Sequence, residues 1–113
     1  MPAYNRIDRI SEEVKRELSM IIRELKDPRL GKAVVSVVNV NVTKDLKFAK
    51  AFISVLGAED VQKGAMDALK SAAGFIHKEV GRRINLRNTP EFKFVLDNSI
   101  EYGAHINEVL KNL

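Results

Sequence analysis

The sequence comprises 113 residues, 45% of them hydrophobic, with a formal net charge of +4 and a pI near 9.5. This length suits one domain, and the apolar content supports a hydrophobic core and argues against wholesale disorder. The absence of cysteine excludes disulfide scaffolds, thiolate metal sites and cysteine nucleophiles. No apolar run approaches the roughly 18 residues that span a membrane, and the start, MPAYNRIDRI, lacks the apolar core of a signal peptide. We therefore expect a cytoplasmic protein that does not associate with membranes.

The N-terminal stretch has the apolar spacing of a long helix. Its apolar residues recur at intervals of three and four, namely Ile7, Ile10, Val14, Leu18, Ile21 and Leu25. Asn5 can cap the start. Asp27 ends the helix because the residue before a proline, here Pro28, resists helical geometry. The sequence DPRLGK that follows is predicted to be a turn.

Two stretches rich in valine, alanine and phenylalanine then predict a β-hairpin. In AVVSVVNVNVT, residues 33–43, valines alternate with Asn39 and Asn41, which is typical of a strand with one apolar face. After the short connection KDLK, residues 48–56 (FAKAFISVL) read as a second strand. One face of that strand would carry Phe48, Lys50 and Phe52, and the other Ala49, Ala51, Ile53 and Val55.

A helical run covers roughly residues 60–85. Its apolar stripe consists of Met66, Leu69, Ala73, Ile76, Val80 and Ile84. The run contains Gly74 and Gly81, each of which costs roughly 1 kcal/mol relative to alanine inside a helix. One alternative is a single helix; the other is two helices that meet at SAAG, residues 71–74, with backbone N–H groups exposed at the start of the second. Gly81 allows either close approach of RNA or close packing against a neighbour.

After Pro90, the alternating sequence EFKFVL predicts a third strand, and the residues from Ser99 to Leu113 predict a final helix. Because the third strand returns after a helical crossover, it should run parallel to one strand of the hairpin. The predicted order is α-β-β-α-(break)-α-β-α. This order makes residues 1–113 a single α+β domain in which helices pack on a three-stranded mixed sheet.

Residues that could carry catalysis are poorly placed. His77 and His105 lie on different predicted helices and belong to no metal-ligand pattern, so we expect no metal site. The sequence has neither a GxxxxGK phosphate loop nor a GxGxxG turn, and its serines have no identifiable base. We therefore expect a non-enzymatic protein with no catalytic residues, no cofactor and no small-molecule substrate.

Positive charge is concentrated between residues 32 and 90, whereas residues 91–113 are acidic. On a single helix, a cationic row would lie opposite the apolar stripe, formed by Lys63, Lys70, Gly74, Lys78 and Gly81, with Arg82 slightly beyond. Glycines in such a row would let a phosphate backbone approach closely. The alternative is an ordinary solvated helix face, and charge alone supports both equally. The aromatic residues, Phe48 and Phe75 among them, are expected to lie mostly in the core, which argues against a base-stacking platform.

The order of elements resembles a type II KH domain, in which a GXXG loop between two helices clamps the nucleotide backbone. The chain has no GXXG, but Ala72-Ala73-Gly74 resembles the Ala-x-Gly kink that replaces this loop in the bacterial ribosome-binding factor A family. LRNTPEFKFVLDNSIEYG resembles that family's signature, and RIDRISEEVKRELSMIIRELKDPRL resembles its first helix and Asp-Pro-Arg turn. The signature positions are filled by Leu86, Arg87, Pro90, Phe92, Phe94, Asp97, Ser99 and Gly103. The resemblance covers nearly the whole chain.

The resemblance implies a KH-like assembly factor that binds the free 30S subunit, assists late maturation of the 16S rRNA 5′ end and is associated with growth in the cold. We expect a monomer whose partners are the 30S ribosomal subunit and 16S rRNA, and whose helix–kink–helix surface contacts rRNA phosphates. The expected RNA-binding residues are Lys63, Lys70, Ala72, Ala73, Gly74, Lys78, Arg82, Arg83 and Arg87. A candidate second basic patch consists of Lys44, Lys47 and Lys50. Arg83 and Arg87 could instead pair with Asp97 or cap carbonyl groups.

The alternative function is a protein–protein interaction module. It would dock on a ribosomal protein or another factor, with the basic face incidental. Exposed apolar residues on the open face of the sheet, such as Val35 and Val37, would favour this alternative.

Overall fold

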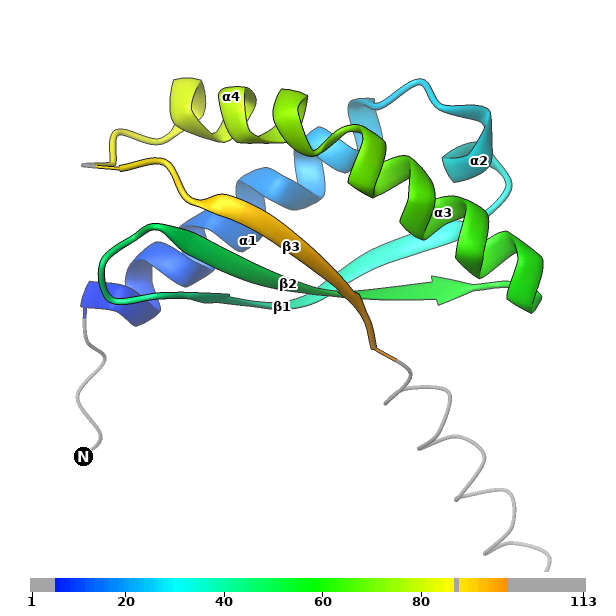
Figure 1. Ribbon diagram of the computed structural model, residues 1–113, viewed down its shortest axis with the longest axis horizontal. Coiled ribbons are helices and arrows are strands. Elements are labelled where there is room, and N and C mark those ends of the chain that lie inside the picture. The colour runs from blue at the N-terminus through cyan, green and yellow to red at the C-terminus, as the bar shows by residue number, and fades with distance from the viewer. Residues whose placement is uncertain (1–5, 87, 98–113) are drawn as a thin grey trace, which may run out of the picture.

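The helices of the chain pack on a three-stranded sheet (Figure 1). The computed structural model describes residues 6–86 and 88–97. Its elements are, in order, α1 (Arg6–Glu24), α2 (Pro28–Gly31), β1 (Val34–Val42), β2 (Phe48–Leu56), α3 (Glu59–Ser71), α4 (Ala73–Arg83) and β3 (Glu91–Leu96). The predicted α+β class is confirmed. The predicted cap at Asn5, the final helix from Ser99 and the side chain of Arg87 lie outside the described residues.

β2 is the central strand of the sheet. β1 pairs with one edge of it in antiparallel fashion and β3 pairs with the other edge in parallel, so the strand order is β1-β2-β3. The predicted hairpin and the predicted parallel return of the third strand are therefore confirmed, with α3 and α4 as the crossover. The register of the hairpin shifts between Val37 and Asn39, which leaves Val38 as an extra residue in β1.

This bulge determines which valines of β1 face the helices. Val40 and Val42 are buried, and Val35 and Val37 pack against the same core while remaining partly exposed. The extra residue reverses the alternation of side chains, so odd-numbered valines before the bulge share a face with even-numbered ones after it. The expectation that Val35 and Val37 lie on the open face was therefore wrong. Val34, which is 62% exposed, is turned away from the core instead.

The core lies between the sheet and the helices. Its fully buried members include Val14, Leu18 and Ile21 of α1, Ala49, Ala51 and Ile53 of β2, and Leu69, Ile76 and Val80 of α3 and α4. The other face of β2 carries Phe48 and Lys50, which are exposed. Within the part of the chain that the structure describes, the helices therefore cover one face of the sheet and leave the opposite face open.

The segment DPRLGK contains a short helix where a turn was predicted. α1 ends at Glu24, three residues earlier than expected, and α2 spans Pro28–Gly31. The carboxylate of Asp27 caps α2 by accepting hydrogen bonds from the Arg29 backbone N–H at 2.9 Å and from the Arg29 guanidinium at 2.8 Å. The hydrogen bond from the Arg29 side chain is the main reason that the pKa of Asp27 is lowered. A helix of four residues is too short to produce an apolar periodicity, so the sequence pattern does not reveal it.

Candidate nucleic-acid interface

α3 and α4 meet at Ala72, which decides between the two alternatives in favour of two helices. Ala72 has φ −88° and ψ 1°, in the sparsely populated bridge region. Its N–H donates to the carbonyl of Ala68 at 3.0 Å, and its own carbonyl accepts from the N–H of Ile76 at 2.8 Å. One residue therefore ends α3 and begins α4. Figure 1 shows the resulting bend, with the two helices following one another along the same side of the molecule.

The two glycines of this region differ in their surroundings. Gly74 is exposed, does not adopt a positive φ, and would place an added Cβ in open space with nothing within 4 Å. A Cβ added to Gly81 would lie 2.7 Å from Oγ1 of Thr89, closer than such atoms can approach. Gly81 therefore allows the segment before β3 to pack tightly against α4, whereas Gly74 leaves the surface beside the junction unobstructed.

A hollow of about 300 Å³ lies beside the junction. It is lined by Ala73, Gly74 and His77 of α4 and by Glu91 and Phe92 of β3. His77 lies within hydrogen-bonding distance of the Pro90 carbonyl, with Nδ1 at 2.9 Å, and because a carbonyl accepts, Nδ1 carries the proton of this bond. The histidine ring is thus held by the backbone next to β3.

Four of the predicted cations are exposed on the two sides of the junction. Lys63 and Lys70 lie on the flank of α3 opposite its buried residues, and Lys78 and Arg82 lie on the corresponding flank of α4. The single-helix geometry assumed from the sequence does not apply, because the chain bends at Ala72. The four cations nevertheless lie on the solvent side of α3 and α4, and we call them the cationic row.

Arg83 is placed differently from the other cations of α4. Its side chain is only 17% exposed and lies 2.6 Å from Glu24 and 3.8 Å from Glu17, both on α1, and 3.2 Å from Glu79 on α4. Arg82, by contrast, is 69% exposed and pairs with Glu79 at 2.9 Å. The hydrogen bond from Arg82 is the largest cause of the lowered pKa of Glu79, and Arg83 acts in the same direction. Arg83 thus joins α4 to α1, a role that sequence reasoning missed because Glu17 and Glu24 are distant along the chain.

The candidate second basic patch is divided in the structure. Lys44 and Lys47 lie on the hairpin turn and line a hollow of about 410 Å³, whose other lining residues are Arg6, Ile7, Asp45, Leu46 and Asn88. Lys50 lies apart, on the open face of the sheet, with Nζ 5.5 Å from the ring centroid of Phe52 and with Lys93 as its register partner. Arg6 and Asn88 were not predicted to join this patch, since only the fold brings them to the turn.

The hairpin turn is fixed by local hydrogen bonds. Thr43 Oγ1 donates to the Asp45 carboxylate at 2.6 Å, and the same carboxylate accepts from the Lys47 N–H at 3.0 Å. Leu46 adopts the left-handed region, with φ 61°, while its side chain is buried. Such a conformation is strained for leucine and persists only where the surroundings hold it. The backbone that carries Lys44 and Lys47 is therefore held in one conformation by the turn.

Two aromatic side chains correct the expectation that the phenylalanines lie mostly in the core. Phe75, in the first turn of α4, is 53% exposed, and Phe48, at the start of β2, is 54% exposed. Phe94 is buried as expected, and Phe92 is partly buried with its ring stacked at 6.1 Å from that of Phe94. The apolar stripe drawn from the sequence did not include Phe75, and this omission was the available signal of its exposure.

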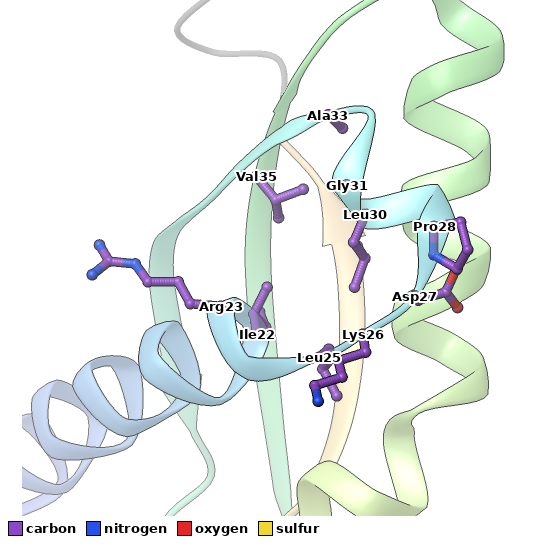
Figure 2. Close-up of a pocket in the computed structure, with 10 residues that line it drawn as sticks. All are labelled: Ile22, Arg23, Leu25, Lys26, Asp27, Pro28, Leu30, Gly31, Ala33 and Val35. Carbon is purple, nitrogen blue, oxygen red and sulfur yellow. The ribbon is translucent and has the colours of Figure 1, made fainter.

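A further hollow of about 450 Å³ lies between the end of α1, α2 and β1 (Figure 2). Its apolar lining comprises Ile22, Leu25, Leu30, Ala33 and Val35. Figure 2 shows Leu30 projecting into this space and the Arg23 side chain extending away from it. The charged residues Arg23, Lys26 and Asp27 also line it, so the hollow is a mixed polar and apolar depression next to β1.

Residues 6–86 and 88–97 contain neither a candidate metal site nor a membrane-spanning helix. No group of three or more His, Cys, Asp or Glu side chains in these ranges could hold a metal ion. No helix in the same ranges is both long and apolar enough to cross a membrane.

The sequence and the fold of this chain are similar to those of known proteins. The family model described as ribosome-binding factor A matches residues 6–110 of the chain. The chain belongs to the ribosome-binding factor A family. A ribosome-binding factor A from Acetivibrio thermocellus is 58% identical over 106 residues, which cover 93% of this chain and 85% of that protein.

Solved structures of the ribosome-binding factor A family share the fold. The crystal structure of ribosome-binding factor A from Thermus thermophilus has a TM-score of 0.73 at 26% identity and covers 82% of this chain and 97% of that one. A homology model of the Thermus thermophilus ribosome-binding factor A, fitted into a cryo-EM map of its complex with the 30S subunit, has a TM-score of 0.65 at 26% identity. It covers 78% of this chain and 91% of that one.

Proposed function

We propose that this protein is a non-enzymatic assembly factor that binds the free 30S subunit through rRNA phosphates and assists late maturation of the 16S rRNA 5′ end. The family membership supports this proposal, as does the Thermus thermophilus relative that was fitted into a 30S complex. The observation that carries it is the exposed cationic row of Lys63, Lys70, Lys78 and Arg82 along α3 and α4. Phosphate contacts of this kind supply affinity and orientation without base specificity.

The helix junction adds to the attraction for phosphate. The N-terminus of α4 carries the positive end of the helix dipole, and the alanine at its N-cap has no side chain that could compete for the first N–H groups. Gly74 leaves open space at this end of the helix, so a phosphate could approach the backbone. In this proposal the phosphate lies against the backbone of residues 72–74. It is flanked by the side chains of Lys70 and Lys78.

The remaining predicted cations take different places in the proposal. Arg83 holds α4 against α1 through its carboxylate partners, and phosphate contact falls to its more exposed neighbour Arg82. Arg87 stays a proposed phosphate contact. Lys44 and Lys47 are proposed as secondary contacts at the hairpin turn, and Lys50 belongs to the open face of the sheet.

Charge reversal on the two helices tests the proposed surface. The variant Lys70→Glu/Lys78→Glu should lose binding to purified 30S subunits in a sedimentation assay while keeping its circular dichroism spectrum. The matched control is Lys50→Glu/Lys93→Glu, which makes the same change in net charge on the open face and replaces one like-charged register pair by another. If only the control variant lost binding, the open face of the sheet, and not α3 and α4, would be the surface that contacts the 30S subunit.

The proposed role in maturation needs a separate measurement. In cells whose copy of this protein is removed, primer extension on 16S rRNA from free small subunits should show an unprocessed 5′ end. Re-expression of the wild-type chain should restore the mature end, and the Lys70→Glu/Lys78→Glu variant should not. A normal 5′ end in the depleted cells would show that the protein is not needed for maturation, even if it binds the subunit.

A second candidate function is docking on a protein. It is favoured by Val34 and Leu56, which are register partners on the sheet and are 62% and 55% exposed. Crosslinking to the small subunit followed by nuclease digestion separates the two functions. Crosslinks from Val34 and Leu56 positions that survive digestion would identify a protein partner, whereas crosslinks from α3 and α4 that disappear would identify RNA.

A further inference from the structure

Phe75 is a large apolar side chain that packing among residues 6–86 and 88–97 leaves about half exposed. It lies in the first turn of α4 and is 53% exposed, whereas the helix buries Ile76 and Val80. Phenylalanine is also a poorer helix former than leucine, lysine or glutamate. Neither packing within the described residues nor helix propensity therefore explains an aromatic ring here.

The neighbours of Phe75 on the helix surface are cations. At about 100° per residue, Phe75, Lys78 and Arg82 fall within about 60° of one another, and residues three apart on a helix are direct neighbours. All three are exposed. Glu79 is the acidic residue of this turn, and its carboxylate is engaged by Arg82 at 2.9 Å and by Arg83 at 3.2 Å. An aromatic face therefore lies beside positive charge at the helix junction.

We propose that Phe75 stacks on an unpaired nucleobase of rRNA whose neighbouring phosphates lie on Lys78 and Arg82. Single-stranded RNA is bound in this way where aromatic rings accompany a positively charged surface, because every base offers a π-face. The open space at Gly74 lets the nucleotide approach the first turn of α4. The inference rests on the proposed function and adds a base contact to a surface otherwise made for phosphates.

The chain contains no tryptophan, so a single reporter can be placed at this position. Phe75→Trp should keep the affinity of the wild-type chain, and its fluorescence should be quenched when a protein-free 16S rRNA transcript is added. Phe48→Trp is the matched control, because Phe48 is equally exposed, at 54%, but lies on β2. Its fluorescence should not change. Quenching of the control alone would overturn the proposal.

Affinity for purified 30S subunits provides the second readout. Removal of a stacked ring by Phe75→Ala should weaken binding roughly 5- to 150-fold. Phe75→Leu should weaken it to a similar extent, because leucine keeps the apolar contact but lacks the π-face. Phe48→Ala and Phe48→Leu should bind as the wild type does. Since Phe75 is exposed, its variants should melt at the temperature of the wild-type chain, so a loss of binding would not reflect unfolding.

Three outcomes would contradict the stacking contact. Wild-type affinity in both Phe75→Ala and Phe75→Leu would show that the ring makes no contact. Wild-type affinity in Phe75→Leu with loss in Phe75→Ala would show an apolar contact with a protein. No quenching of Phe75→Trp by bound transcript would exclude a base at this position. Full affinity of Lys70→Glu/Lys78→Glu would instead contradict the proposed phosphate surface, so the two failures are distinguishable.

Discussion

The guanidinium of Arg83 on α4 lies 2.6 Å from the carboxylate of Glu24 on α1, across 59 positions of sequence. Glu17 lies 3.8 Å from the same guanidinium, on the same face of α1. The contact therefore fixes α4 against the first helix. Because α4 carries one half of the cationic row, the position of that half depends on this ion pair.

Replacement of Arg83 should destabilise the fold more than replacement of its neighbour. Arg83→Met leaves three carboxylates without their shared partner, whereas Arg82→Met removes a single exposed pair of the kind that contributes little to stability. We expect the Tm of Arg83→Met to fall by several degrees and that of Arg82→Met to change little. Thermal melting followed by circular dichroism measures both, and equal Tm values would mean that the network is not structural.

Acid should weaken the fold partly through Glu79. The pKa of Glu79 is lowered in the folded chain, chiefly by Arg82, so its contribution is present above the ordinary glutamate pKa of about 4.3 and is lost as the pH falls through the folded value. The Tm of the wild-type chain should therefore fall more steeply below about pH 4.3 than that of Glu79→Gln. An NMR titration of the Glu79 carboxyl would check the direction of the shift, and a midpoint above the ordinary value would contradict it.

Gly81 should tolerate alanine only if Thr89 is shortened. In the wild-type background, the new Cβ would meet Oγ1 of Thr89 at 2.7 Å, so Gly81→Ala should lower the Tm. In a Thr89→Ala background the nearest remaining atom is the Cβ, 3.6 Å away, and the same substitution should raise the Tm by favouring the helix. A double-mutant cycle on thermal stability measures this coupling. If the changes in Tm caused by Gly81→Ala and Thr89→Ala were additive, the loss of stability in Gly81→Ala would not come from contact with Thr89.

Gly74 should accept alanine with a gain in stability. It has no positive φ and no atom within 4 Å of an added Cβ, so Gly74→Ala should stabilise the chain by about 0.4–1 kcal/mol, because alanine restricts the unfolded state. Urea denaturation gives the free energy of unfolding. A lower stability of this variant would show that the junction needs the conformational freedom of glycine.

Affinity for the 30S subunit should depend on salt if phosphate contacts dominate. Contacts from Lys63, Lys70, Lys78 and Arg82 would give a log–log slope near −3, at roughly −0.7 for each contact with single-stranded RNA. Lys63→Ala should reduce the magnitude of the slope by about 0.7. Binding measured over a series of potassium chloride concentrations provides the slope, and an affinity independent of salt would rule out the phosphate mechanism.

Much of the fold could be predicted from the sequence because buried and exposed side chains alternate along much of β2 and β3. The alternation of Phe48, Lys50 and Phe52 against small apolar residues identified both faces of β2, and Pro90 marked the start of β3. Predictions were wrong where a local irregularity changed the period. The extra residue Val38 reversed the first half of β1, and the single turn of α2 had no period to detect.

The candidate site was less accessible to sequence reasoning. Lys63, Lys70 and Lys78 were identified because they lie opposite an apolar stripe, which is a local pattern. The partners of Arg83 and the neighbours of Lys44 come from distant segments, and charge alone does not say which cations are already paired. The exposure of Phe75 was not predicted either, because a phenylalanine usually indicates burial and only its place outside the apolar stripe indicates exposure.

The central position of β2 has a consequence for the order of folding. Its pairing with β1 closes over a short turn, held by the Thr43 N–H bond to the Phe48 carbonyl at 2.9 Å, whereas its pairing with β3 requires α3 and α4 to be in place. Contacts that close long loops lose chain entropy before they gain contact energy, so we expect the hairpin to form early and β3 to dock last. Truncation of Phe94 should then mainly accelerate unfolding, while truncation of Val40 should slow folding, as stopped-flow kinetics would show.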